Sequence, residues 1–280
     1  SSPPFAFFPS QYPGSGEAMV DTTQALAPAR RAATVMLARD GAQGIEVFMV
    51  KRERMVDLVS GATVFPGGKI DSDDADVELP WGTSLLGPEP DTWVAAVRET
   101  FEETGVLIAG REGDPEVVDA PVASRITAEA RADILAKRLQ FSQLLAREAL
   151  FPAVEHMVYF ARWISPEILD KRFDAHFFLV EMPDGQKATH DGQEAIAGYW
   201  VRPLELVGAA DAGKLFLVPA TRCNLELLGE SRTVAEAMRA ARARSAPTIM
   251  PRLVKDERGV RVMIPAEAGY RTTEHIIERT

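Results

Sequence analysis

The chain of 280 residues has very little cysteine, because Cys223 is its only one. A disulfide within the chain is therefore excluded, and so is a zinc site built from several cysteines. Such sparse use of cysteine fits a reducing compartment, and we expect an intracellular, cytoplasmic protein.

Long apolar runs are also missing. No stretch approaches the roughly 20 apolar residues of a membrane-spanning helix, so we expect no membrane partner. Residues 1–28 are rich in proline, serine and glycine and begin without a basic segment. This composition is unlike that of a signal peptide and predicts a flexible N-terminal tail.

The glycine-rich loops of common nucleotide-binding folds are absent, since neither G-x-G-x-x-G nor G-x-x-x-x-G-K-[ST] occurs. Basic residues are in deficit, with 31 against 41 acidic ones and a formal net charge of −10. A field of that sign repels nucleic acid phosphates, so we expect no nucleic acid partner. Small anionic substrates stay open, because a divalent metal can reverse the local sign of a site.

The hydrophobic pattern that is present alternates between strands and helices. Strands are predicted at 32–38, 45–50, 106–109, 157–164, 176–182 and 198–201, with two more within 248–265. Helices are predicted at 91–104, within 126–150, and at 203–214, 221–228 and 233–244. The acidic, proline-containing stretch 72–90 is predicted to be a loop. This interleaving favours an α/β fold with a mixed sheet.

The helix at 91–104 carries the most informative side chains. At 3.6 residues per turn, Glu99, Glu102 and Glu103 fall on one face. Their charges repel one another, and Arg98 offsets only part of that repulsion. A hard divalent cation such as Mg²⁺ or Mn²⁺, which prefers oxygen ligands, would offset far more. Taken alone, however, the same pattern also fits a solvated acidic helix face.

The surrounding sequence favours the metal site. Residues 98–106 read Arg-Glu-Thr-Phe-Glu-Glu-Thr-Gly-Val, and residues 65–68 read Phe-Pro-Gly-Gly. Together they resemble the box of the Nudix hydrolase family, G-x5-E-x7-R-E-U-x-E-E-x-G-U, in which U is aliphatic.

The chain departs from this box in two places. Thr100 stands where an aliphatic residue is usual, and an insertion separates Gly68 from Arg98. In the family box the first glutamate stands eight positions before the arginine. Here that position, counted back from Arg98, is Pro90, with Glu89 beside it, so the first glutamate of the box has no assigned residue.

An interrupted box resembles the coenzyme A diphosphatase-like branch of the family. Residues 163–166, 172–178 and 199–203 are also similar to that branch. The resemblance implies a Nudix α/β/α sandwich with a mixed sheet over residues 29–205. It further implies a helical insertion at about 111–150 and a C-terminal extension, 206–280, packed on the Nudix domain.

The resemblance also implies roles for individual residues. The metal, Mg²⁺ or Mn²⁺, would be held by Glu99, Glu102, Glu103 and the backbone carbonyl of Gly67. Arg98 would orient these carboxylates through charge-assisted hydrogen bonds. The general base would be a box glutamate or one from a later loop, where Glu194 is the candidate; a surface carboxylate is the alternative reading of Glu194.

Substrate specificity is indicated by a second family pattern, L-L-T-x-R-[SA]-x3-R-x3-G-x3-F-P-G-G. Arg52 and Gly61 fit it, whereas Glu53 and Asp57 replace its small residue and its second arginine. Arg52 is therefore a candidate for binding substrate, together with Gly67 and Gly68.

The resemblance thus predicts metal-dependent hydrolysis of a diphosphate linkage in a small nucleotide. Coenzyme A or an acyl-CoA is the leading substrate, and ADP-ribose or NADH is the alternative. A non-catalytic Nudix-fold nucleotide sensor is a further alternative. Homodimers are common in the family, so a homodimer is a candidate assembly.

Overall fold

The computed structural model describes residues 28–52, 62–80, 83, 85–114, 116–169, 171–192, 195–257 and 259–278. The predicted N-terminal tail up to residue 27, and the candidate base Glu194, lie outside the described residues.

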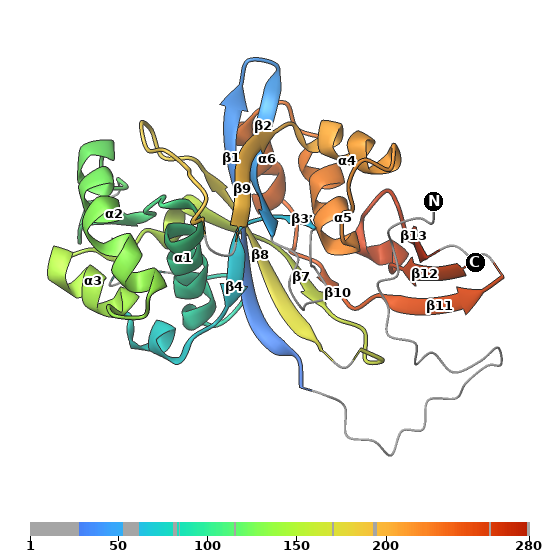
Figure 1. Ribbon diagram of the computed structural model, residues 1–280, viewed down its shortest axis with the longest axis horizontal. Coiled ribbons are helices and arrows are strands. Elements are labelled where there is room, and N and C mark those ends of the chain that lie inside the picture. Colours follow the sequence, from blue (N-terminus) through green and yellow to red (C-terminus); the bar gives the residue numbers. More distant parts are fainter. Residues whose placement is uncertain are drawn as a thin grey trace.

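A mixed sheet forms the centre of the described structure (Figure 1). Its strands are β1 (Arg30–Gly41), β2 (Gly44–Arg52), β3 (Thr63–Val64), β4 (Gly67–Lys69), β7 (Met157–Ile164), β8 (Phe173–Glu181), β9 (Ala195–Val201) and β10 (Thr248–Ile249). The order is β10-β7-β8-β1-β2-β3, with β4 also beside β1 and β9 also beside β2. β1 runs parallel to β8, and β10 runs parallel to β7, while the other pairs in this sheet are antiparallel.

Strand β1 shows why this sheet lies in the interior. Val35 and Leu37 belong to the apolar cluster on one face, and Met36 and Ala38 belong to the cluster on the other. Because successive side chains of a strand point to opposite faces, a strand that is apolar at both sets of positions is buried on both sides.

Helices cover the two faces of the sheet. On one side lie α1 (Pro90–Thr104), α2 (Ala120–Leu135) and α3 (Phe141–Glu148), and on the other lie α4 (Pro203–Asp211), α5 (Pro219–Leu228) and α6 (Val234–Arg242) (Figure 1). This arrangement confirms the predicted α/β/α sandwich. The division into domains stays a prediction; its boundary after residue 205 falls within α4.

Smaller elements complete the fold. They are the strand pair β5 (Ala109–Gly110) and β6 (Phe151–Pro152), the three-stranded sheet β11 (Arg252–Asp256), β12 (Gly259–Met263) and β13 (Glu274–Glu278), and the 3-10 helices η1 (Ser72–Asp76), η2 (Val154–His156) and η3 (Ala266–Ala268). Across the described part of the chain, no helix has the length and apolar character needed to cross a membrane.

The strand predicted at 106–109 is mostly irregular, although its apolar residues are fully buried. The side chain of Gln186 takes the place of a neighbouring strand there. It accepts a hydrogen bond from the Leu107 N–H (2.9 Å) and donates one to the Leu107 carbonyl (3.1 Å). The buried backbone N–H and C=O groups of this apolar run needed hydrogen-bond partners, but a side chain could supply them in place of a neighbouring strand.

Helix α1 is enclosed on both sides. Pro90 stands in its first turn, and Gly105 ends it at φ 73°, a left-handed conformation that glycine adopts without strain. Trp93, Val97 and Phe101 pack into the core. The carboxylate-bearing face is buried as well, so it is not a solvated acidic face.

Candidate active site

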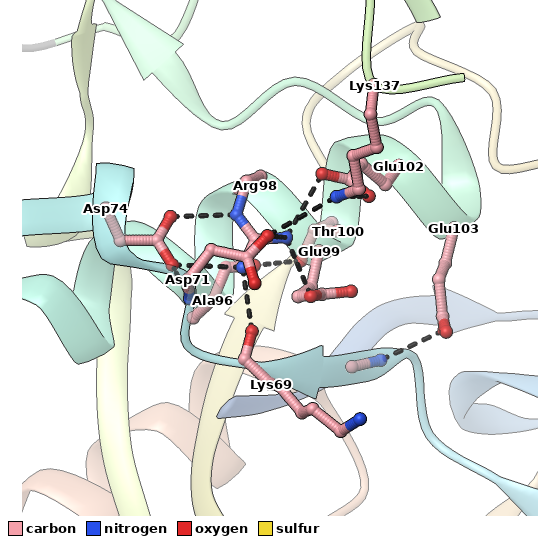
Figure 2. A network of polar contacts seen from close by, with 11 residues as sticks. Lys69, Asp71, Asp74, Ala96, Arg98, Glu99, Thr100, Glu102, Glu103 and Lys137 are labelled. Carbon is pink, nitrogen blue, oxygen red and sulfur yellow. Dashed lines mark hydrogen bonds and ion pairs between the residues drawn. The ribbon is translucent and has the colours of Figure 1, made fainter. Parts of the chain in front are cut away.

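The polar face of α1 lies against β4 (Figure 2). Pairing with β1 sets the position of β4, because Gly67 lies opposite Thr34 and Gly68 opposite Ala33. From there the Gly67 N–H donates a 3.0 Å hydrogen bond to Glu103 Oε2. The strand and the helix are thus joined directly at one of the predicted metal ligands.

The two glycines allow this close approach. A Cβ at Gly68 would lie 2.5 Å from Oε1 of Glu99. A Cβ at Gly67, whose φ is +152°, would lie 2.3 Å from the Ala33 carbonyl oxygen. Both distances are far below van der Waals contact. At Gly67 the obstacle is backbone, so glycine is required there, whereas at Gly68 the carboxylate of Glu99 would have to move.

Arg98 is the centre of the carboxylate cluster and is only 2% exposed. Its Nη1 donates to Glu99 Oε1 over 2.7 Å and to Glu102 Oε1 over 3.1 Å. Burial alone would lower the pKa of Arg98, but the carboxylates around it, including Asp74, raise that pKa instead. Arg98 therefore stays charged and fixes the orientation of two glutamates.

Asp74 is one residue of the cluster that the sequence-based prediction did not include. It is buried in η1 and accepts hydrogen bonds from Arg98 Nε (2.8 Å) and Nη2 (3.0 Å). Counting forward from Gly68, instead of back from Arg98, places the first acidic position of the box at Asp74. Glu89, found by counting back, is exposed at the start of α1.

The carboxyl of Glu99 is shifted towards its protonated form. Burial raises its pKa to about 7, with the neighbouring Glu102 carboxylate adding to the effect and Arg98 opposing it. Near neutral pH this carboxyl therefore exists in both protonation states.

The unusual Thr100 is accommodated within the helix. Its hydroxyl donates to the Ala96 carbonyl over 2.7 Å, so this buried hydroxyl has a hydrogen-bond partner. The replacement of an aliphatic residue is thus compatible with full burial.

Helix α2, in the predicted insertion, and the turn that follows it bring two cations to the site. Arg131 Nε donates to the Glu102 carbonyl oxygen (2.9 Å), and its Nη1 and Nη2 bond Thr189. Lys137 Nζ lies 3.6 Å from Glu102 Oε2 and 3.3 Å from Asp71 Oδ2 (Figure 2). No local motif could have indicated either residue, because they reach the site only through tertiary packing.

The donors fit a hard divalent cation by their chemistry, since three carboxylates lie beside a glycine backbone that a Cβ would obstruct. Among the described residues, however, no three His, Cys, Asp or Glu side chains converge closely enough to hold an ion. Glu103 is bonded to Gly67 and Glu102 to cationic side chains. Holding an ion therefore requires these carboxylates to converge more closely.

The remaining predicted site residues are placed only in part. Arg52 ends β2, and its backbone pairs with Ala195 at the start of β9. The side chain of Arg52 lies outside the described residues, as does Glu194. Their roles stay predictions.

Comparison with known proteins identifies the family. A family model described as the NUDT19 Nudix domain matches residues 83–228. A Caenorhabditis elegans protein that carries a nudix hydrolase name is 30% identical over 190 residues, which cover 68% of this chain and 57% of that protein. The acyl-coenzyme A diphosphatase NUDT19 of Xenopus laevis is 24% identical (62% of this chain, 57% of that protein). NUDT19 of Gallus gallus is 25% identical (68% and 65%).

The chain thus spans between 57% and 65% of the length of these relatives. Among solved structures, a NUDIX hydrolase from Alicyclobacillus acidocaldarius is 25% identical, with a TM-score of 0.61, and the match covers 77% of this chain and 97% of that one. The box, the sandwich fold and these matches agree: the chain belongs to the Nudix hydrolase family.

Proposed function

We propose that this protein is a divalent-metal-dependent hydrolase that cleaves the diphosphate linkage of a nucleoside diphosphate derivative. Its leading substrate is coenzyme A or an acyl-CoA, which would yield a phosphopantetheine and adenosine 3′,5′-bisphosphate. The observation that carries the proposal is the set of Glu99, Glu102 and Glu103 on α1, held beside the Gly67–Gly68 backbone. The relatives named as acyl-coenzyme A diphosphatases support the choice of substrate.

In the proposed mechanism, Glu102, Glu103 and the Gly67 carbonyl would hold the metal, with Glu99 as a further ligand. When bound, Mg²⁺ or Mn²⁺ neutralises the diphosphate and lowers the pKa of a water molecule. Arg98 keeps the glutamates in place through its hydrogen bonds to Glu99 and Glu102.

The chemical step breaks one P–O bond. A water oxygen attacks one phosphorus, its proton passes to a general base, and the other phosphate leaves. Glu194 is the proposed base, and a box glutamate is the alternative. Positioning and charge neutralisation supply most of the rate enhancement in such phosphoryl transfers.

A substrate panel tests the proposal directly. Purified protein with Mg²⁺ or Mn²⁺ would be given coenzyme A, acetyl-CoA, ADP-ribose, NADH, a dinucleoside polyphosphate and a nucleoside triphosphate, and the products would be identified by mass. We expect coenzyme A species to be cleaved fastest and chelation to abolish cleavage. Faster cleavage of ADP-ribose or NADH would change the assigned substrate, whereas the proposed diphosphate hydrolysis would stand.

A Glu103→Gln variant separates an enzyme from a sensor. An enzyme should lose turnover by orders of magnitude, because a ligand of the charge-stabilising metal is removed. If the wild-type chain binds nucleotides yet cleaves none with either metal, the enzymatic proposal fails and the sensor alternative replaces it.

A further inference from the structure

Lys137 occupies an unusual position just beyond the end of α2. Ala136 caps this helix, and Lys137 follows with φ 55°, a left-handed conformation that is disfavoured for a residue with a Cβ. Glycine is the usual residue at this place in a helix terminus. A lysine held in such a conformation suggests that its side chain has a function.

The side chain of Lys137 extends towards the carboxylates of the site (Figure 2). Its Nζ lies 3.3 Å from Asp71 Oδ2 and 3.6 Å from Glu102 Oε2. Arg98 Nη1 lies 3.8 Å from Asp71 Oδ2 and 3.1 Å from Glu102 Oε1. Two cations, one on α1 and one just after the end of α2, therefore share the same two carboxylates.

The two cations differ in how firmly they are held. Arg98 is 2% exposed and donates hydrogen bonds to several acceptors, so its removal would leave buried charges uncompensated. Lys137 is 64% exposed, and its contact with Glu102 is longer than a hydrogen bond. Exposed ion pairs of this kind are weak, so Lys137 is the partner that Glu102 can exchange.

We propose that Lys137 is an internal counter-ion of Glu102 that competes with the divalent metal for this carboxylate. This inference rests on the proposed function, because it takes Glu102 to be a metal ligand. The ammonium group keeps Glu102 compensated and near its working position, and it gives up the carboxylate when the metal takes it. A positioning lysine on the helical insertion thus sets the metal affinity of the box.

When Lys137 gives up Glu102 to the metal, its positive charge becomes available to the anionic substrate. An ammonium displaced from Glu102 stays beside the site, because the backbone at Lys137 is fixed by its N–H, which donates to the Ile134 carbonyl over 2.8 Å. A compact cation with three donors is suited to phosphate oxygens. Lys137 would then contribute to binding the diphosphate.

Direct titration with Mn²⁺, followed by the paramagnetic resonance signal of the free ion, tests the competition without any substrate. We expect the Lys137→Met chain to bind Mn²⁺ about three- to tenfold more tightly than the wild type, because a repelling charge is removed. Lys137→Gly, which also removes the left-handed strain, should show the same gain. Lys137→Arg keeps the charge and should not bind more tightly.

Arg138 provides the matched control. It is the next residue and equally exposed at 64%, but its guanidinium pairs with Asp133 in the last turn of α2. Arg138→Met should leave Mn²⁺ affinity unchanged. At saturating Mn²⁺, Lys137→Met should also raise KM for the cleaved diphosphate several-fold.

The competition is overturned if Lys137→Met binds Mn²⁺ as the wild type does, or more weakly, since a purely structural lysine would give those results. Absence of Mn²⁺ binding to the wild type would overturn it too. An unchanged KM would overturn the contact with phosphate alone. Failure of the substrate panel, by contrast, would defeat the proposed reaction while leaving the Mn²⁺ comparison valid.

Discussion

The guanidinium of Arg98 and the carboxylate of Asp74 form two hydrogen bonds, of 2.8 Å and 3.0 Å, across 24 residues of chain. Arg98 also donates to the Lys69 carbonyl over 2.8 Å. These contacts bring the first part of the Nudix box against the second although the sequence between them is lengthened. The insertion therefore leaves these contacts intact, because Asp74 lies before it and Arg98 after it.

Replacing Asp74 by Asn should destabilise the protein and weaken the site. Asp74 is 1% exposed, and the Asn side chain keeps only one of the two oxygens that accept hydrogen bonds from Arg98. We expect the free energy of unfolding to fall by about 1–3 kcal/mol, because a buried donor of Arg98 loses its acceptor. Asp76→Asn, on the same short helix but exposed, should change it by less than about 0.5 kcal/mol. Denaturant unfolding of both variants measures the difference, and equal stabilities would contradict the role assigned to Asp74.

The pKa of Glu99 predicts a pH-dependent effect on stability. Its folded value of about 7 lies above the ordinary 4.5, so its contribution to stability is fully present below pH 4.5 and is lost as the pH rises through 7. Glu99→Gln keeps a neutral side chain at every pH. We expect this variant to exceed the wild type by about 1–3 kcal/mol at pH 8, with chelator present, and by much less at pH 5.

Thermal unfolding at several pH values measures this effect. Glu112→Gln, which removes an exposed carboxylate, should give a small difference that does not grow between pH 5 and pH 8. A Glu99→Gln difference that is independent of pH would show that burial does not disfavour the charged form.

Substitution of Gly68 by Ala should damage the site more than the fold. The added Cβ would lie 2.5 Å from the Glu99 carboxylate, and a displacement on the order of 1 Å at a reacting centre costs roughly a hundredfold in turnover. Gly208→Ala introduces the same methyl group in α4, where no atom lies within 4 Å. That control should keep full turnover and gain about 0.5–1 kcal/mol in stability. Equal turnover in the two variants would refute the steric argument.

Much of this architecture followed from the sequence because it depends on local pattern. Apolar alternation predicted the strand at Met157–Ile164 with both its ends, and the Gly105 cap predicted the end of α1. The three glutamates were found because helical spacing alone puts them on one face. Local pattern failed at Leu107, where a single glutamine side chain replaces a neighbouring strand.

Asp74, Arg131 and Lys137 needed the structure for different reasons. Asp74 carried a usable signal, the spacing from Gly68, which was lost by counting from the wrong side of the insertion. Arg131 and Lys137 carried no such signal, because arginines and lysines in or next to a surface helix are ordinary. Only packing of α2 against α1 brings these two side chains to the carboxylates.

Arg131 links three parts of the molecule. It bonds the Glu102 carbonyl in α1 from its own place in α2, and it bonds both the hydroxyl and the carbonyl of Thr189. The Thr189 N–H in turn donates to the Thr104 carbonyl over 2.8 Å. Arg131 therefore fastens the loop around Thr189 to the end of the helix that bears the glutamates.

Removing this link should loosen the loop without unfolding the protein. In Arg131→Met the Thr189 carbonyl and hydroxyl lose their guanidinium donors, so opening of the loop needs less free energy. We expect amide exchange of Thr189 to quicken by about tenfold or more, as measured by hydrogen exchange, with the core strands unaffected. Arg125→Met removes another arginine of α2, one that pairs with Glu129 and Glu148 away from the site, and should leave Thr189 protected. If both variants exchange Thr189 at the wild-type rate, the hydrogen bond to Thr104 alone holds the loop, and Arg131 serves only to position Glu102.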